Sequence, residues 1–258
     1  MDALGKNKVN SVRKTPPGPV AMRVSADTER PDKRKVRHDR KRQSYLAEAM
    51  SLVVQDGMEG LTIARLANRM NASVGAVYRY FPSKEALIVG LQELAIADFH
   101  TFMQQRLTAH EARLTGAAPD TRALARLLIA FNSYLEHADH SPRPHRLVDT
   151  FLSFPEAVLS DAEAQAVGER LIEPVLTTFV GLLADAAETR AIDAGDDLQR
   201  THLAWAFVHG LDHFRKRDRI MPDSLRVKAL LPIARGNLLR AFGAKPEAIA
   251  QAEKLLPQ

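Results

Sequence analysis

Apolar side chains recur at helical spacing along almost the whole chain from residue 39 onward. The strict alternation of apolar and polar residues that marks a half-buried strand is absent, and no hairpin turn joins two strand-like runs. The pattern therefore predicts an all-α fold. The expected helices lie at about residues 39–56, 63–70, 74–81, 84–113, 120–138, 145–154, 160–189, 197–217, 223–243 and from 246 onward.

The first three of these helices have clear end signals. Gly57 stands where a left-handed residue commonly ends a helix. Thr62 and Ser73 can cap the second and third helices, and Asn71 tolerates the left-handed conformation of a tight turn between them. Pro82 ends the third helix because proline disfavours helical backbone at the residue before it. These signals predict two short helices joined by a three-residue turn, which is the layout of a helix-turn-helix.

The third helix has two distinct faces. Val77 and Phe81 are four residues apart and are expected to point into the core. A helix that enters the major groove needs small residues near its start and polar groups that reach phosphates and base edges. A plain helical hairpin with a polar outer face shows the same period, so the pattern alone leaves both interpretations open. The expected groove-facing residues are Val74, Gly75, Tyr78 and Arg79.

Positive charge is concentrated at the start of the chain. Residues 1–42 contain 13 Lys or Arg and five Asp or Glu, a net charge of +8, whereas the remainder has a net charge of −3. Residues 1–36 include a Pro-Pro-Gly-Pro run and show no helical period, so we expect a disordered basic arm. Such an arm suits a polyanion, because each neutralised phosphate releases counterions. A solvated tail that only aids solubility is the alternative.

Several kinds of chemistry are not indicated. The chain has no cysteine, which fits a reducing compartment and removes disulfides and thiolate metal sites. We find no secretory signal, no uncharged apolar run of about 18 residues, and none of the common hydrolase, metalloprotease, phosphate-loop or dinucleotide motifs. We therefore expect a cytoplasmic, nucleoid-associated protein without membrane insertion, cofactor or bound metal, and not an enzyme.

Two segments resemble the N-terminal domain of the TetR family of transcriptional regulators. They are GMEGLTIARLA at residues 57–67 and SVGAVYRYFPSKEAL at residues 73–87, and the resemblance covers about residues 40–95. After the basic arm at 1–36, it implies a DNA-binding domain at 37–84 and a helical effector-binding and dimerisation domain at 85–258. Val74 stands where a basic or polar residue is frequent, so we expect less polar base readout there.

The resemblance also implies roles for individual residues. The positions matching Thr62, Tyr78 and Lys84 contact phosphates in the family, and those matching residues 73–79 enter the groove. The predicted DNA-binding residues are accordingly Thr62, Ser73, Val74, Gly75, Tyr78, Arg79 and Lys84.

Members of this family are homodimers that read palindromic DNA, and their last two long helices form a four-helix bundle. In this chain those helices are at about 197–217 and 224–242. The first has a face of small and aromatic residues suited to close packing, although the same face could pack within one subunit. The expected interface residues are Leu203, Phe207, Gly210, Leu211 and Phe214.

An effector pocket is expected among the middle helices, by the same resemblance. Aromatic residues at helical spacing are more often plain core, so this assignment competes with a simpler one. The polar candidates are His137, His140, His209 and His213. His209 and His213 have the i, i+4 spacing of a metal pair, but no further ligand accompanies them. The expected pocket residues, for an unknown and largely apolar small molecule, are Phe99, Phe102, Phe131, Phe151, Trp205 and His209.

The leading hypothesis is a sequence-specific regulator, a repressor that a small-molecule effector releases from a palindromic operator in double-stranded DNA. The alternative is a DNA-bound protein of chromosome organisation or division control that has no small effector. An α-helical enzyme with dispersed catalytic residues is the third hypothesis.

Overall fold

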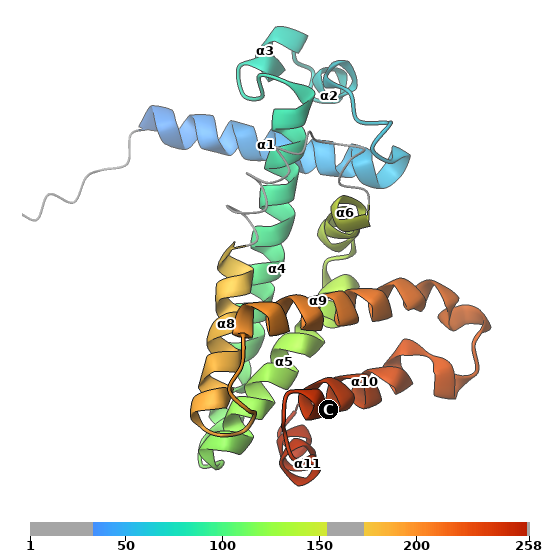
Figure 1. Cartoon of the computed structure of the whole chain (residues 1–258). Coiled ribbons are helices and arrows are strands. Elements are labelled where there is room, and N and C mark those ends of the chain that lie inside the picture. The colour runs from blue at the N-terminus through green and yellow to red at the C-terminus, as the bar shows by residue number, and fades with distance from the viewer. Residues whose placement is uncertain (1–32, 154–172, 257–258) are drawn as a thin grey trace, which may run out of the picture.

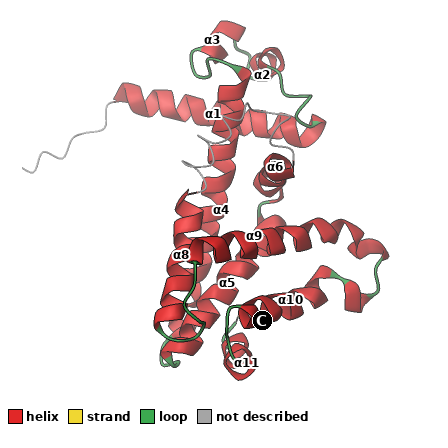
Figure 2. Cartoon of the chain, in the orientation of Figure 1, coloured by secondary structure: helices red, strands yellow, loops and turns green. Residues whose placement is uncertain are grey.

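The computed structural model describes residues 33–153 and 173–256, and the side chains of all of these except 148–153. Within these ranges the chain is helical and has no strand (Figure 2). The α-helices are α1 Lys33–Asp56, α2 Ile63–Arg69, α3 Val74–Tyr78, α4 Lys84–Leu114, α5 Pro119–His140, α6 Pro142–Ser153, α8 Glu173–Glu188, α9 Asp197–Phe214, α10 Val227–Ala241 and α11 Pro246–Lys254. Two 3₁₀ helices, η3 Arg215–Ile220 and η4 Asp223–Leu225, connect α9 to α10.

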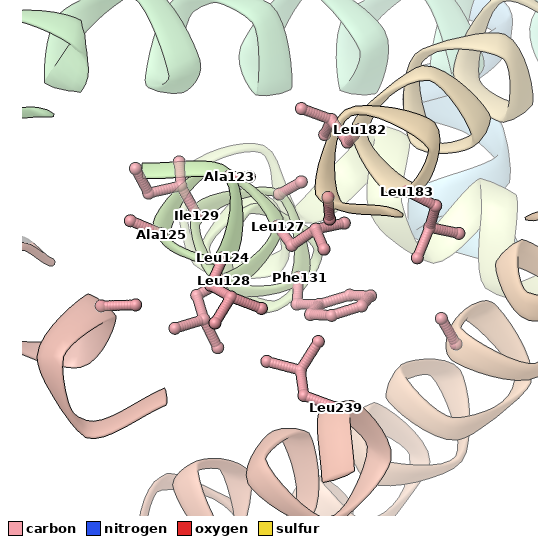
Figure 3. Close-up of a cluster of buried hydrophobic side chains, with 14 of the residues drawn as sticks. Ala123, Leu124, Ala125, Leu127, Leu128, Ile129, Phe131, Leu182, Leu183 and Leu239 are labelled. Carbon is pink, nitrogen blue, oxygen red and sulfur yellow. The ribbon is translucent and has the colours of Figure 1, made fainter. Parts of the chain in front are cut away.

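Two apolar clusters organise these helices, and α4 runs through both (Figure 1). The N-terminal cluster joins α1, α2, α3 and the first turns of α4. The larger cluster joins the rest of α4 to α5, α8, α9, α10 and α11, and α5 passes through its centre (Figure 3). A movement of α4 relative to either cluster would therefore be transmitted to the other.

The helix α6 connects the two clusters a second time. It packs against α1, α4 and α5. Leu147 on α6 is 1% exposed and belongs to the N-terminal cluster, although it lies more than fifty residues beyond the other members in sequence. The N-terminal domain is thus held to the rest of the chain by both α4 and α6.

The local signals of the N-terminal domain are confirmed. Gly57 has φ 70° and Asn71 has φ 48°, so both adopt the predicted left-handed conformation. The Thr62 and Ser73 hydroxyls each accept a hydrogen bond from the backbone N–H three residues on, at 3.2 Å. Ser83 caps α4 in the same way, at 3.1 Å. These side chains satisfy helix N-terminal donors that would otherwise lack a partner.

Several predicted helix ends are wrong. The first helix begins at Lys33 rather than at 39, so residues 33–36 are helical and not part of a disordered arm. Lysine and arginine are good helix formers and can extend a helix without an apolar stripe. The third helix ends at Tyr78 rather than at 81. Proline disfavours helical backbone at the residue before it, so Pro82 acts against a helix that reaches Phe81. Residues 1–32 and 154–172 lie outside the described residues.

The C-terminal hairpin also differs from its predicted bounds. The helix α9 ends at Phe214 and continues to Ile220 as 3₁₀ rather than as α-helix. The helix α10 begins at Val227, where its backbone N–H donates to the Asp218 carboxylate at 3.1 Å. This bond ties the start of α10 back to η3.

By length and composition alone, α4 could cross a membrane. Its apolar residues, among them Leu87, Leu91, Phe99 and Met103, lie in the two packed clusters. Packing within the chain therefore accounts for the apolar character of α4.

Candidate nucleic-acid interface

The predicted core face of α3 is confirmed. Val77 is fully buried and Phe81 is 1% exposed, and both belong to the N-terminal cluster. Val74 and Tyr78, on the opposite face, are 43% and 47% exposed. Large apolar and aromatic side chains are costly to leave in water, so their exposure on a five-residue helix indicates a surface that meets another molecule.

The exposed face of α3 is open and carries an uncommitted cation. A Cβ built on Gly75 would meet no atom within 4 Å, so a partner can approach the backbone closely there. Arg79 is exposed, and in the described part of the chain it makes no hydrogen bond or ion pair. Thr62 and Ser73 are exposed at the ends of α2 and α3, and Lys84 is half-exposed in the first turn of α4. The predicted DNA-binding residues therefore share one accessible end of the molecule (Figure 1).

Two arginines of α2 behave differently from Arg79, because they brace the domain. Arg65 donates to the Asp56 carboxylate at 2.6 Å and to the Gly60 carbonyl at 2.9 Å. Arg69 donates to the Glu48 carboxylate at 2.7 Å. These bonds fasten α2 to α1 and to the loop before it. We infer that α2 supports α3 from behind and that Arg79 is the arginine available for base edges.

A basic segment at the start of α1 lies close to α3. This segment, residues 33–42, contains seven Lys or Arg and one Asp, and its first eight residues are exposed. The His38 ring stacks on the Tyr80 ring at 4.7 Å, just after α3, and Arg42 donates to Glu93 on α4 at 3.2 Å. The free end of the segment projects away from α4 (Figure 1). A row of cations thus extends from the edge of α3.

A second polar arrangement lies inside the chain, between α4, α5, α6 and α9. His137 Nε2 lies 2.9 Å from the Asp98 carboxylate, and His145 Nε2 lies 2.9 Å from the Asp212 carboxylate. The two histidines meet through their Nδ1 atoms at 3.4 Å. Arg215 extends this row of polar side chains, because it pairs with Asp212 at 3.5 Å. We call Asp98, His137, His145 and Asp212 the histidine network.

Burial shapes the charges of this network. Burial lowers the pKa of His137, while the hydrogen bond and the charge of Asp98 act in the opposite direction. Burial also acts to raise the pKa of Asp212, but the hydrogen bond and charge of His145 and the charge of Arg215 outweigh it and leave that pKa below its ordinary value. Asp212 is therefore ionised, with a positive group on one side of it at least.

The predicted pocket residues lie in several different surroundings. Phe99 and Phe131 lie in the larger apolar cluster, and Trp205 packs against it. Phe102 packs on the rings of His137 and His140 at 5.5 and 5.0 Å. The candidate His209 has its Nδ1 atom 2.8 Å from Tyr134 Oη. The side chain of the last candidate, Phe151, is outside the described residues.

The predicted dimer residues form an exposed stripe on α9. Leu203, Phe207 and Phe214 are 60%, 39% and 53% exposed, and Gly210 lies among them with open space above its Cα. Leu211 instead packs partly against the larger apolar cluster of its own chain. Ile233 on α10 is 61% exposed. A run of apolar residues with this exposure is typical of an unfilled protein interface.

Sequence reasoning singled out His137 and His209 but missed Asp98, His145 and Asp212. The partners of the network are 39 and 67 residues apart in sequence, so no local pattern joins them. Within residues 33–147 and 173–256, where side chains are described, no group of three or more His, Cys, Asp or Glu residues is arranged to hold a metal ion.

A capped α2, a short turn through a left-handed Asn71 and an outward-facing α3 define a helix-turn-helix DNA-binding protein. Residues 46–91 match the family model described as bacterial regulatory proteins, tetR family. The N-terminal domain of this chain is therefore the DNA-binding domain of the TetR family of transcriptional regulators.

Three known proteins illustrate the similarity. The nucleoid occlusion factor SlmA of Haemophilus influenzae is 26% identical over 179 residues, 69% of this chain and 75% of SlmA. The class C tetracycline repressor protein of Escherichia coli is 37% identical over 65 residues, 25% of this chain and 30% of the repressor. The structure of RolR in complex with its ligand resorcinol superposes with a TM-score of 0.55 at 19% identity, covering 87% of this chain and 98% of RolR. This last likeness concerns the fold.

Proposed function

We propose that this regulator is a homodimeric repressor that binds a palindromic operator and is released from it by a small-molecule effector. The observation that carries the proposal is the exposed α3 face, with Val74, Tyr78 and an unpaired Arg79 above a buried Val77. A tetracycline repressor is similar over 65 residues, and RolR, which binds resorcinol, shares the fold over 87% of this chain. The proposed regulator is not an enzyme, and binding to DNA would keep it at the nucleoid.

The proposed dimer is formed by the exposed stripe of α9 together with α10. Its two-fold axis would place two α3 helices about 34–36 Å apart, or one turn of DNA. The effector would bind among α4, α5, α8 and α9, and would act by favouring a dimer whose α3 helices are wrongly spaced. The basic segment of α1 would add phosphate contacts beside each α3.

Substitutions on α3 test the DNA interface. Tyr78→Ala and Lys84→Ala should weaken binding to every sequence and reduce its salt dependence, because both residues would contact phosphates. Arg79→Ala should cost about 1–3 kcal/mol and relax the preference at one operator position. Arg113→Ala is the matched control, since this exposed arginine lies in the last turn of α4, at the end of that helix away from α3. Full operator affinity in both Tyr78→Ala and Arg79→Ala would assign DNA binding to another element.

A second candidate function is favoured by the similarity to SlmA, which extends over 69% of this chain. In this case the chain would bind many chromosomal sites and act in chromosome organisation or division without a small effector. Genome-wide occupancy separates the two candidates. A few promoters, one of them beside the protein's own gene, support the repressor, while hundreds of scattered sites support the second candidate.

A further inference from the structure

The two histidines of the network face each other through their Nδ1 atoms, and two neutral rings cannot form a hydrogen bond in this arrangement. A carboxylate only accepts hydrogen bonds, so His137 Nε2 and His145 Nε2 must each carry a proton toward Asp98 and Asp212. A neutral imidazole has a single N–H group. If both rings were neutral, their Nδ1 atoms would present two lone pairs to each other at 3.4 Å. One additional proton between the Nδ1 atoms turns this repulsion into a hydrogen bond.

We propose that His137 and His145 hold one shared proton, and that this buried cation fastens α6 between α5 and α9. The two carboxylates at the ends of the network balance its charge. His137 is the neutral partner that accepts, and His145 is the imidazolium that donates from Nδ1 to His137 and from Nε2 to Asp212. The lowered pKa of His137, caused first by its burial, agrees with this division.

The groups around the pair favour a single positive charge. Asp98 faces it from α4 and Asp212 from α9. Arg215 neutralises part of Asp212 but is itself paired with Asp139 of α5. The remaining neighbours are His140 of α5, whose charge would disfavour a second proton, and the Tyr134 ring, 5.0 Å from that of His145. A fully protonated pair would bring two cations together and would place two N–H groups opposite each other at 3.4 Å. Binding of a second proton is therefore disfavoured, and the pair holds one.

The shared proton acts on the DNA-binding domain through α6. His145 lies only two residues before Leu147, whose side chain is buried in the N-terminal cluster. Loss of the proton would loosen His145 from His137 and free α6 to shift against α1 and α4. This step rests on the proposed function, in which the arrangement without effector is the one that binds the operator. Operator affinity should then fall as the pH rises through the titration of the pair.

Histidine ¹⁵N spectra test the proton itself, without any need for DNA. Protein labelled at histidine nitrogens is followed from about pH 5 to about pH 9 through two-bond and three-bond ¹H–¹⁵N correlations. The proposal expects both Nδ1 atoms to titrate together in one step as the pair loses its proton. His145→Gln and Asp212→Asn should abolish the coupled step. His100→Gln should leave it in place, since His100 on α4 faces Thr178 and lies outside the network.

Operator binding tests the consequence. Between about pH 6.5 and about pH 8.5 the wild type should lose about fivefold more affinity than His145→Gln, with His100→Gln behaving as the wild type. Coupled titration together with a pH response equal to that of His145→Gln would overturn the link to α6. Failure to bind DNA at any pH would instead count against the proposed function, because the spectra do not depend on it.

Two results would overturn the shared proton. One is a pair of histidines that are both neutral throughout this range, or that titrate independently of each other within it. The other is tight binding of Zn²⁺ added alone in calorimetry, with release of the proton and loss of binding in both His137→Gln and His145→Gln. The 3.4 Å separation of the Nδ1 atoms would also suit two ligands of a tetrahedral ion, and that result would assign the site to a metal.

Discussion

Asn71 shows how one residue shapes the DNA-binding end of this protein. It joins α2 to α3 with φ 48°, and Arg190 is the other non-glycine residue with positive φ in the described part of the chain. The left-handed conformation costs most residues with a Cβ about 1–2 kcal/mol, and asparagine is one of the few that adopt it routinely. The turn therefore sets the angle between α2 and α3, and only a few residue types can occupy position 71 without strain.

Replacement of Asn71 tests this reading. Asn71→Ala should lower the free energy of unfolding by about 1 kcal/mol, because alanine keeps the Cβ and lacks the amide that favours the left-handed conformation. Asn71→Gly should stay within about 0.5 kcal/mol of the wild type, since glycine adopts positive φ freely. Urea unfolding at neutral pH measures both. An equal loss in the two variants would show that a contact of the amide, and not the backbone conformation, is what matters.

Single residues were predictable from the sequence wherever their role depends on close neighbours. The Thr62 and Ser73 caps and the left-handed Gly57 follow from spacing within a few positions, and the structure has all of them. His145 illustrates the opposite case. Its role arises from Asp212, and only the packing of α6 against the rest of the chain brings the two together.

At the scale of elements, the apolar period located the helices but not their ends. The segment that extends α1 to Lys33 has no apolar stripe, so its helicity depends on propensity and on the turns that follow it. The period also did not distinguish the surroundings of the aromatic side chains. Phe99 and Phe131 are buried in the larger cluster, and Phe102, at similar helical spacing, packs on two histidine rings.

The basic segment of α1 gives a prediction about salt dependence. Its exposed cations would contact phosphates beside α3, so their removal should make operator affinity less sensitive to salt. Each lost phosphate contact should reduce the slope of log affinity against log salt by about 0.9. Titrations at several salt concentrations measure the slope. The variant for this test replaces Lys33, Lys35, Arg37 and Arg40 with glutamine.

The control for this variant makes the same change of charge far from α3. It should leave the slope of the wild type unchanged within about half of one phosphate contact. If the two variants changed the slope equally, the basic segment would act only through the net charge of the protein. The control replaces Arg113, Arg122, Lys245 and Lys254 with glutamine, and these exposed residues lie outside both α3 and the proposed dimer helices.

At the scale of the whole molecule, α4 and α6 make the DNA-binding domain and the C-terminal helices one mechanical unit. The family resemblance predicted that α4 joins them, as the helix that links the effector pocket to the DNA-binding domain. It did not predict the part of α6, since among the described side chains of that helix Leu147 is the one in the N-terminal cluster, far in sequence from the other members. An effector among the middle helices would therefore have two routes to α3, and the histidine network lies across the second.

The exposed stripe of α9 predicts that this unit works in pairs. Burial of one large apolar side chain stabilises an interface by about 1.5–3 kcal/mol, and a two-fold interface contains each residue twice. Leu203→Glu combined with Phe207→Glu should therefore raise the dimer dissociation constant by about a thousandfold or more. Sedimentation velocity at micromolar concentration should find monomers, and operator affinity should fall with the loss of the second α3. Ala250→Glu, at an exposed site on α11, should remain dimeric. A double variant that stays dimeric and binds the operator normally would place the interface elsewhere on the molecule.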